Sequence, residues 1–146
     1  MANDKRKMKG GKFMIGILVV THGNAGIELV KSSELIIGHQ EKIDALSLNH
    51  GDDINELEQK VAKKSAELDD GSGVLVMVDL LGGSPCNVTG KNIKGSDNIE
   101  CLTGVNLPML IEAIASRENN SLKDLVNIAK DSSLQGIKDL RSLMFN

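Results

Sequence analysis

The sequence predicts an α/β domain in which helices cover both faces of a doubly wound, mostly parallel sheet. Two continuous aliphatic runs, 14–20 and 74–78, are typical of strands that are buried on both faces. Stretches with helical periodicity alternate with the strands, which favours right-handed βαβ crossovers. The 146 residues are 40% apolar and 1% aromatic, so we expect one domain with an aliphatic core and a single functional site.

The first half of the chain contains two strands and two helices. The strand 14–20 runs into a glycine-containing loop, and residues 25–37 then show a helical pattern that Gly38 ends. Residues 43–48 alternate weakly, which predicts a shorter strand at an edge of the sheet. Asp53 followed by Glu56 resembles a capping box and predicts the start of a second helix.

The second half repeats this alternation. Pro85 suits the first turn of a short helix that extends to about residue 93. Residues 99–103 predict a fourth strand. Asn106 and Ser121 are expected to be the N-caps of two further helices.

The two ends of the chain carry weaker signals. The leader, residues 1–12, has a net charge of +4, and we expect it to be disordered and separate from the domain at 13–146. In the tail, the spacing of Ile137, Leu140 and Leu143 fits a helix about as well as a strand. The tail is therefore ambiguous from its own pattern.

Charge and composition exclude several classes of function. Without the leader, the body has a net charge of -7 and almost no aromatic residues, which argues against nucleic acid as a partner. No apolar run approaches the roughly 20 residues that span a bilayer, and the leader lacks a secretory signal, so we expect a cytoplasmic protein. Cys86 and Cys101 are expected to be buried small apolar residues rather than metal ligands or a disulfide.

Polar residues follow the first and third strands. In the flavodoxin-like strand order 2-1-3-4, the switch point at which ligands bind lies between these two strands. His22 follows the first strand and Asp79 the third, so we expect the two side chains to meet. A carboxylate that accepts from one ring N–H would fix the tautomer and leave the other nitrogen as a nucleophile.

The loop that follows Asp79 suits an anion. Gly82 and Gly83 allow backbone N–H groups to approach closely, Ser84 adds a hydroxyl donor, and the next helix begins there. Together with His22, these residues predict a site that holds a phosphoryl group. A Ser-His-Asp hydrolase is a weaker interpretation because the G-x-S-x-G elbow is absent, and no nucleotide-binding glycine motif occurs.

The other two histidines, His39 and His50, lie in loops at opposite ends of the second strand. We expect both to be solvated surface residues without a catalytic role.

Several separated motifs resemble one known family. They are the Thr21-His22-Gly23 strand end, Val78-Asp79, Gly82-Gly83-Ser84-Pro85 with Asn87, and the segment 104–110 with the sequence GVNLPML. Together, over roughly residues 13–142, they resemble the enzyme IIA (EIIA) of the mannose, fructose and sorbose class of bacterial sugar phosphotransferase systems.

The resemblance implies a specific carrier function. It implies that His22 accepts a phosphoryl group on Nε2 from the phosphocarrier HPr and passes it to enzyme IIB, and that Asp79 orients Nδ1. Thr21, Gly23 and the loop of Gly82, Gly83 and Ser84 would then hold the phosphoryl group. No metal or nucleotide cofactor would be needed.

The same resemblance implies the partners of the chain. Enzyme IIB would serve a membrane IIC/IID permease, which could bring this subunit to the inner face of the membrane. Family members resemble homodimers that exchange a C-terminal strand, which predicts an antiparallel edge strand over about 136–142.

Two features depart from the family pattern, and two alternatives stay open. The sequence ends at Asn146, so IIB is expected on a separate chain, and Cys86 stands where relatives are expected to carry an aromatic residue. One alternative is the phosphotransfer subunit of a dihydroxyacetone kinase. The other is a sensor whose phosphorylation state regulates a partner protein.

Overall fold

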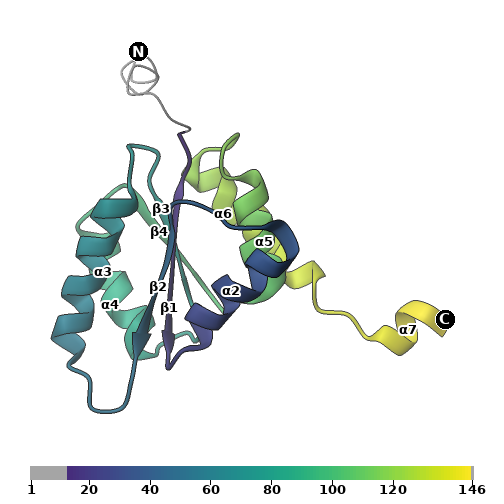
Figure 1. Ribbon diagram of the computed structural model, residues 1–146, viewed down its shortest axis with the longest axis horizontal. Helices are drawn as coiled ribbons and strands as arrows, with labels where there is room; N and C mark the ends of the chain where they lie inside the picture. Colours follow the sequence, from purple (N-terminus) through teal and green to yellow (C-terminus); the bar gives the residue numbers. More distant parts are fainter. Residues whose placement is uncertain (1–12, 146) are drawn as a thin grey trace.

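The computed structural model describes residues 13–145. Its core is a four-stranded parallel sheet in the order β2-β1-β3-β4, as the sequence predicts (Figure 1). The strands are β1 (Gly16–His22), β2 (Ile43–Leu48), β3 (Val74–Val78) and β4 (Ile99–Thr103). All pairings are parallel, so the four carboxyl ends lie at one edge of the sheet. The basic leader lies outside the described residues.

Helices cover both faces of this sheet. Figure 1 shows α3 (Ile54–Leu68) and α4 (Ser84–Lys94) on one side and α2 (Ala25–Ile37), α5 (Leu107–Ser116) and α6 (Leu122–Gln135) on the other. Side chains of β1 and β3 alternate between the two faces: Ile17 and Val19 contribute to the core beneath α5 and α6, and Leu18 and Val20 to the core beneath α3. This alternation explains why both central strands are continuously apolar.

The helix ends use the predicted signals with one difference. Asn106 accepts a hydrogen bond from the Met109 N–H, and Ser121 accepts one from the Asp124 N–H. Asp53 caps α3, but its carboxylate accepts from the Asn55 N–H and not in the capping-box arrangement.

The predicted antiparallel edge strand near the C-terminus is not present in the described part of the structure. The structure has no strand over residues 136–142; a short helix, α7 (Leu140–Phe145), forms instead, and it extends away from the body (Figure 1). Its start is stabilised locally, because Oδ1 of Asp139 accepts from the backbone N–H groups of Arg141 and Ser142. The helical alternative for the tail is therefore the one that the structure adopts.

A buried arginine, Arg117, connects backbone segments at the amino ends of the strands, the edge of the sheet opposite to the candidate site. Arg117 is 3% exposed, and its guanidinium donates to the backbone oxygens of Glu41, Lys42 and Ile15 at 2.6, 3.2 and 3.4 Å. Burial lowers the pKa of this guanidinium, an effect that the neighbouring Glu118 opposes. These contacts tie the start of β1 to the loop before β2, far from the strand ends that carry the candidate site.

None of the helices over residues 13–145 combines the length and the apolar character needed to cross a membrane.

Candidate functional site

His22 and Asp79 meet at the carboxyl edge of the sheet. His22 is the last residue of β1, two residues beyond the predicted strand end, because Thr21 and His22 continue the pairing with Ser47 and Leu48 of β2. Asp79 follows β3 directly. The parallel β1–β3 pairing therefore brings the two side chains together, as the sequence predicts.

One carboxylate oxygen fixes the histidine ring. Oδ2 of Asp79 lies 2.9 Å from Nδ1 of His22 and 2.9 Å from the His22 backbone nitrogen, which donates to it. Burial by itself raises the pKa of Asp79, but the hydrogen bonds and charge of His22 outweigh it, so the net pKa is lowered. The ionised carboxylate favours a proton on Nδ1 and leaves the lone pair of Nε2 free.

The glycine loop lies against the ring of His22. A Cβ atom at Gly83 would come within 2.8 Å of Cε1 and 3.4 Å of Nε2 of His22, so only glycine allows this approach. Gly82 has a φ of 80°, in the left-handed region that favours glycine. Asn87 stabilises the loop, because its side-chain amide donates to the Gly82 oxygen at 3.2 Å.

The loop ends in the N-terminus of α4. Gly83 is the N-cap and supplies no side-chain cap, so the backbone N–H groups of Ser84 and Cys86 are not occupied by a capping side chain. Pro85 between them has no N–H. An anion on Nε2 would face these donors and the positive end of the helix dipole, and the half-buried Ser84 can add its hydroxyl.

Thr21 and Gly23 shape the loop at the end of β1. Thr21 is fully buried; its hydroxyl accepts from the Gly26 N–H at 2.9 Å and donates to the Gly23 oxygen at 3.2 Å. Gly23 has a φ of 58°, and its N–H donates to the Leu48 oxygen at 2.8 Å. The polar groups of both residues are thus already engaged within the protein, and the geometry gives them a supporting position.

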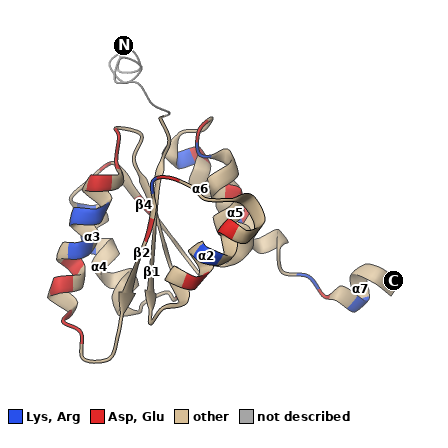
Figure 2. Cartoon of the chain, viewed as in Figure 1, with Lys and Arg blue, Asp and Glu red and all other residues tan. Residues whose placement is uncertain are grey.

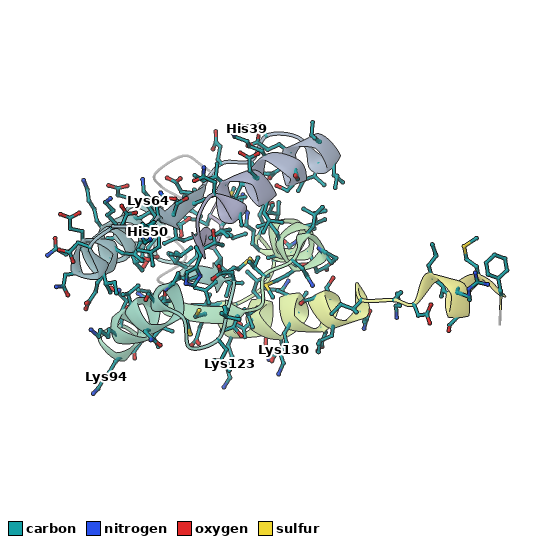
Figure 3. The ribbon with its side chains drawn as sticks, turned by 90° about the horizontal axis from the view of Figure 1, so that it is seen from below. His39, His50, Lys64, Lys94, Lys123 and Lys130 are labelled. Carbon is teal, nitrogen blue, oxygen red and sulfur yellow. The ribbon has the colours of Figure 1, made fainter. Side chains whose placement is uncertain are left out.

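His50 is a residue of this edge that sequence reasoning missed. The structure confirms that it is exposed, but it lines a hollow of about 410 Å³ together with His22. Figure 3 views the molecule from this end and labels His50. The signal that could have found it is its position, because it follows β2 at the same edge at which His22 ends β1.

The two cysteines are half-buried and free. Burial raises the pKa of Cys101 to about 12, and the nearby Cys86 and Glu100 act in the same direction. The Cys101 thiol is thus protonated at neutral pH and unreactive, consistent with the expected structural role.

The fold and the site define a class of protein: an α/β domain in which a carboxylate fixes a histidine ring beside a glycine loop and a helix N-terminus, at the switch point of the sheet. Comparison with known families gives a more specific result. The family model described as "PTS system fructose IIA component" matches residues 16–130. The chain belongs to this EIIA family of the sugar phosphotransferase system (PTS).

Individual relatives agree with this family. The chain is 34% identical over 129 residues to the mannose-specific EIIAB component of Escherichia coli K12, covering 88% of this chain and 40% of that protein. It is 33% identical to the fructose-specific EIIA component of Bacillus subtilis, covering 86% of each. The crystal structure of an EIIA from Streptococcus agalactiae superposes with a TM-score of 0.82 at 36% identity, covering 88% of this chain and 99% of that chain.

Proposed function

We propose that the protein is a phosphoryl carrier of a sugar phosphotransferase system, in which His22 accepts a phosphoryl group from HPr and gives it to enzyme IIB. The observation that carries the proposal is the contact of Asp79 with Nδ1 of His22, which leaves Nε2 as the nucleophile beside the α4 N-terminus. EIIA components are phosphotransfer proteins, so this geometry and the family support the same chemistry.

Each transfer exchanges one P–N bond for another. The lone pair of Nε2 attacks phosphorus while the P–N bond to the donor histidine breaks, and the donor nitrogen keeps that electron pair. Positive charge then develops on the His22 ring, where the ionised Asp79 stabilises it through Nδ1–H. Transfer to enzyme IIB is the reverse reaction with a new acceptor, and no step requires a metal or nucleotide.

The first experiment measures phosphorylation directly. The protein is mixed with phosphoenolpyruvate, enzyme I and HPr, and intact mass is recorded before and after acid or base treatment. We expect one phosphoryl group that is acid-labile and base-stable, absent from His22→Ala and retained in His39→Ala, an exposed histidine at the other end of β2. An unmodified wild-type protein beside fully phosphorylated HPr would refute the carrier role.

The acceptor requires a second measurement. The purified phosphoprotein is incubated with enzyme IIB, and the mass of both proteins is followed. Movement of the phosphoryl group to IIB supports a role in sugar uptake through a IIC/IID permease, and we propose that this reaction takes place in the cytoplasm. Retention on His22, with capture of a regulator or of a dihydroxyacetone kinase instead, would favour one of the alternatives.

We also propose that the protein is a homodimer that uses its C-terminal segment. Four large apolar side chains of α7 are at least 62% exposed, namely Leu140, Leu143, Met144 and Phe145. Burial against a second copy would remove this surface from water. Light scattering should show a dimer for the full chain and a monomer for a chain that ends at Gly136; a full chain that stays monomeric would contradict the proposal.

A further inference from the structure

A second hollow lies between the last turns of α3 and α4, which run side by side in Figure 1. Its volume is about 390 Å³. Small residues leave this space open, and they include Ala62, Ala66 and Gly95. Both helices begin after the carboxyl end of a strand and end at the opposite edge of the sheet, so the hollow lies at the end of the domain away from His22.

One buried hydroxyl in the wall of this hollow is unpaired. Ser65 is 2% exposed, and its Oγ has no hydrogen-bond partner among the described residues. A serine in a helix can donate to the carbonyl oxygen four residues before it, but Ser65 does not. An unsatisfied buried hydroxyl costs free energy and can serve a ligand as donor or acceptor.

The end of the hollow next to Ser65 favours a cation. Asp69 lines the hollow one helical turn beyond Ser65, on the same side of α3. Oδ1 of Asp69 accepts from the N–H groups of Gly71 and Gly73 at 2.8 and 3.0 Å, which leaves its second oxygen for a ligand. Figure 2 shows acidic residues in the connection that leaves α3. Both helices also end here, and their dipoles place negative charge at these ends.

The other end of the hollow carries a cation. Nζ of Lys91 lies 3.6 Å from Oε2 of Glu58, which is one turn before Ala62 on α3. This ion pair is exposed and therefore weak, so Lys91 can also bind an anionic group. Ala62 and Asp69 are separated by about 10 Å along α3, at 1.5 Å per residue. The wall between the two charges is apolar at Ala62 and Ala66.

We propose that this hollow is a binding site for a small zwitterion of the ω-amino acid class. The ammonium group would lie between Oγ of Ser65 and the carboxylate of Asp69, and the carboxylate would lie at Lys91. The methylene chain of the ligand would cover Ala62 and Ala66. A molecule with one charge would satisfy only one end of the hollow. The site is separate from His22, and the inference does not depend on the proposed carrier function.

The first test titrates the full chain with 6-aminohexanoate. We expect saturable shifts of the backbone amide NMR signals of residues 62–69 and 91–96. Hexanoate lacks the ammonium group and hexylamine lacks the carboxylate, so each should bind about tenfold more weakly. Glycine is also a zwitterion, but its two charges are too close together to reach both ends, and it should bind no better than the compounds with one charge.

Variants of the lining residues test the two ends separately. Ser65→Ala should weaken 6-aminohexanoate binding about tenfold, because the ammonium group loses a hydrogen bond. The same variant should not lower the melting temperature of the ligand-free protein, since its hydroxyl is unpaired. Lys91→Met should weaken binding about threefold. Lys94→Met is the matched control: Lys94 is an exposed cation of the same helix that does not line the hollow, and its loss should leave binding unchanged.

Three outcomes would overturn the inference. One is the absence of shifts up to the solubility limit of 6-aminohexanoate. Another is equal binding of hexanoate or hexylamine, which would mean an adventitious additive only. The third is a lower melting temperature of ligand-free Ser65→Ala, which would show that the hydroxyl already has a structural role. None of these outcomes bears on the carrier function, which the phosphorylation of His22 by phospho-HPr tests separately.

Discussion

Oδ2 of Asp79 contacts His22 twice, at 2.9 Å from its backbone nitrogen and 2.9 Å from Nδ1 of its ring. The backbone contact ties Asp79, at the end of β3, to the end of β1, and the ring contact sets the orientation of the imidazole. The same oxygen therefore couples the geometry of the sheet edge to the tautomer of the nucleophile.

Loss of the Asp79 charge should slow phosphoryl transfer without unfolding the protein. In Asp79→Asn an amide oxygen can still accept one hydrogen bond, but it no longer stabilises positive charge on the His22 ring. We expect the single-turnover rate from phospho-HPr to fall by about 10²-fold. Rapid quench of the phosphoprotein measures the rate, and circular dichroism checks the fold. A wild-type rate would show that Asp79 has only a structural role.

A methyl group at Gly83 should displace the ring of His22. The Cβ of Gly83→Ala would approach Cε1 of His22 to 2.8 Å, although the φ of -74° is accessible to alanine. The ring must move relative to Asp79, and we expect the transfer rate to fall about tenfold or more. Rapid-quench kinetics with phospho-HPr tests this; an unchanged rate would mean that the ring is not held where the structure shows it.

Gly90 of α4 offers a matched control for that substitution. A Cβ there would meet no atom within 4 Å, and the residue is in the middle of the same helix. Gly90→Ala should therefore leave the transfer rate unchanged and raise the free energy of unfolding by about 0.5–1 kcal/mol. Urea denaturation measures the stability; a loss of activity in this variant would indicate that any change in α4 disturbs the site.

The fold followed from the sequence where the pattern was strong. The limits of β2, β3 and β4 agree with the sequence, because continuous or alternating apolar residues identify a strand without knowledge of its neighbours. β1 is shifted by two residues from the prediction: it begins at Gly16 and not at Met14, and it ends at His22 and not at Val20. Thr21 and His22 are polar, and only their pairing with β2 makes them part of the strand.

The sequence predicted those parts of the candidate site that depend only on the order of the strands in the sheet. The meeting of His22 with Asp79 requires only that strands 1 and 3 are neighbours. The position of His50 depends on the turn after β2, which is closed by Asp52 and shaped by Gly51. The predicted strand order places His50 at the same edge as His22, but only the shape of this turn shows that both line one hollow, so His50 was assigned to the solvated surface.

The tail shows a different limit. The pattern of Ile137, Leu140 and Leu143 suits a helix and a strand equally, and the strand was preferred from the family resemblance. In the single chain the carboxylate of Asp139 caps a helix, an effect that depends on a local conformation and not on apolar spacing.

Low pH should lower the free energy of unfolding, in part because Asp70 becomes protonated. Its carboxylate accepts from the Met14 N–H at 3.0 Å and from Nζ of Lys42 at 2.7 Å. Burial raises the pKa of Asp70, but these and the Ser72 hydrogen bonds outweigh it and lower the pKa from 3.8 to about 2. Because its pKa is lower in the folded state than in the unfolded state, ionised Asp70 stabilises the fold at pH values above about 4. This stabilisation is lost as the pH falls from about 4 to 2.

The Asp70→Asn variant tests this linkage. We expect it to be less stable than the wild type at pH 7 and to lose less stability between pH 4 and pH 2, as measured by thermal unfolding at each pH. Asp124→Asn removes the same charge at the exposed start of α6. This variant should lose as much stability between pH 4 and pH 2 as the wild type does. An equal loss of stability between pH 4 and pH 2 in the wild type and in Asp70→Asn would contradict the role of Asp70 in acid destabilisation.

Removal of the Arg117 guanidinium should destabilise the fold and leave the chemistry intact. Arg117→Met keeps much of the side-chain volume but leaves the oxygens of Ile15, Glu41 and Lys42 without these donors at a buried position. Since each lost hydrogen bond to a charged group costs about 1.5–3 kcal/mol, we expect the free energy of unfolding to fall by about 3 kcal/mol or more. Urea denaturation measures the loss, and Lys130→Met, which removes an exposed cation from α6, is the control. Because Arg117 lies at the edge of the sheet opposite to His22, the transfer rate per folded molecule should be that of the wild type; a slower rate in the folded fraction would instead reveal coupling between the two edges.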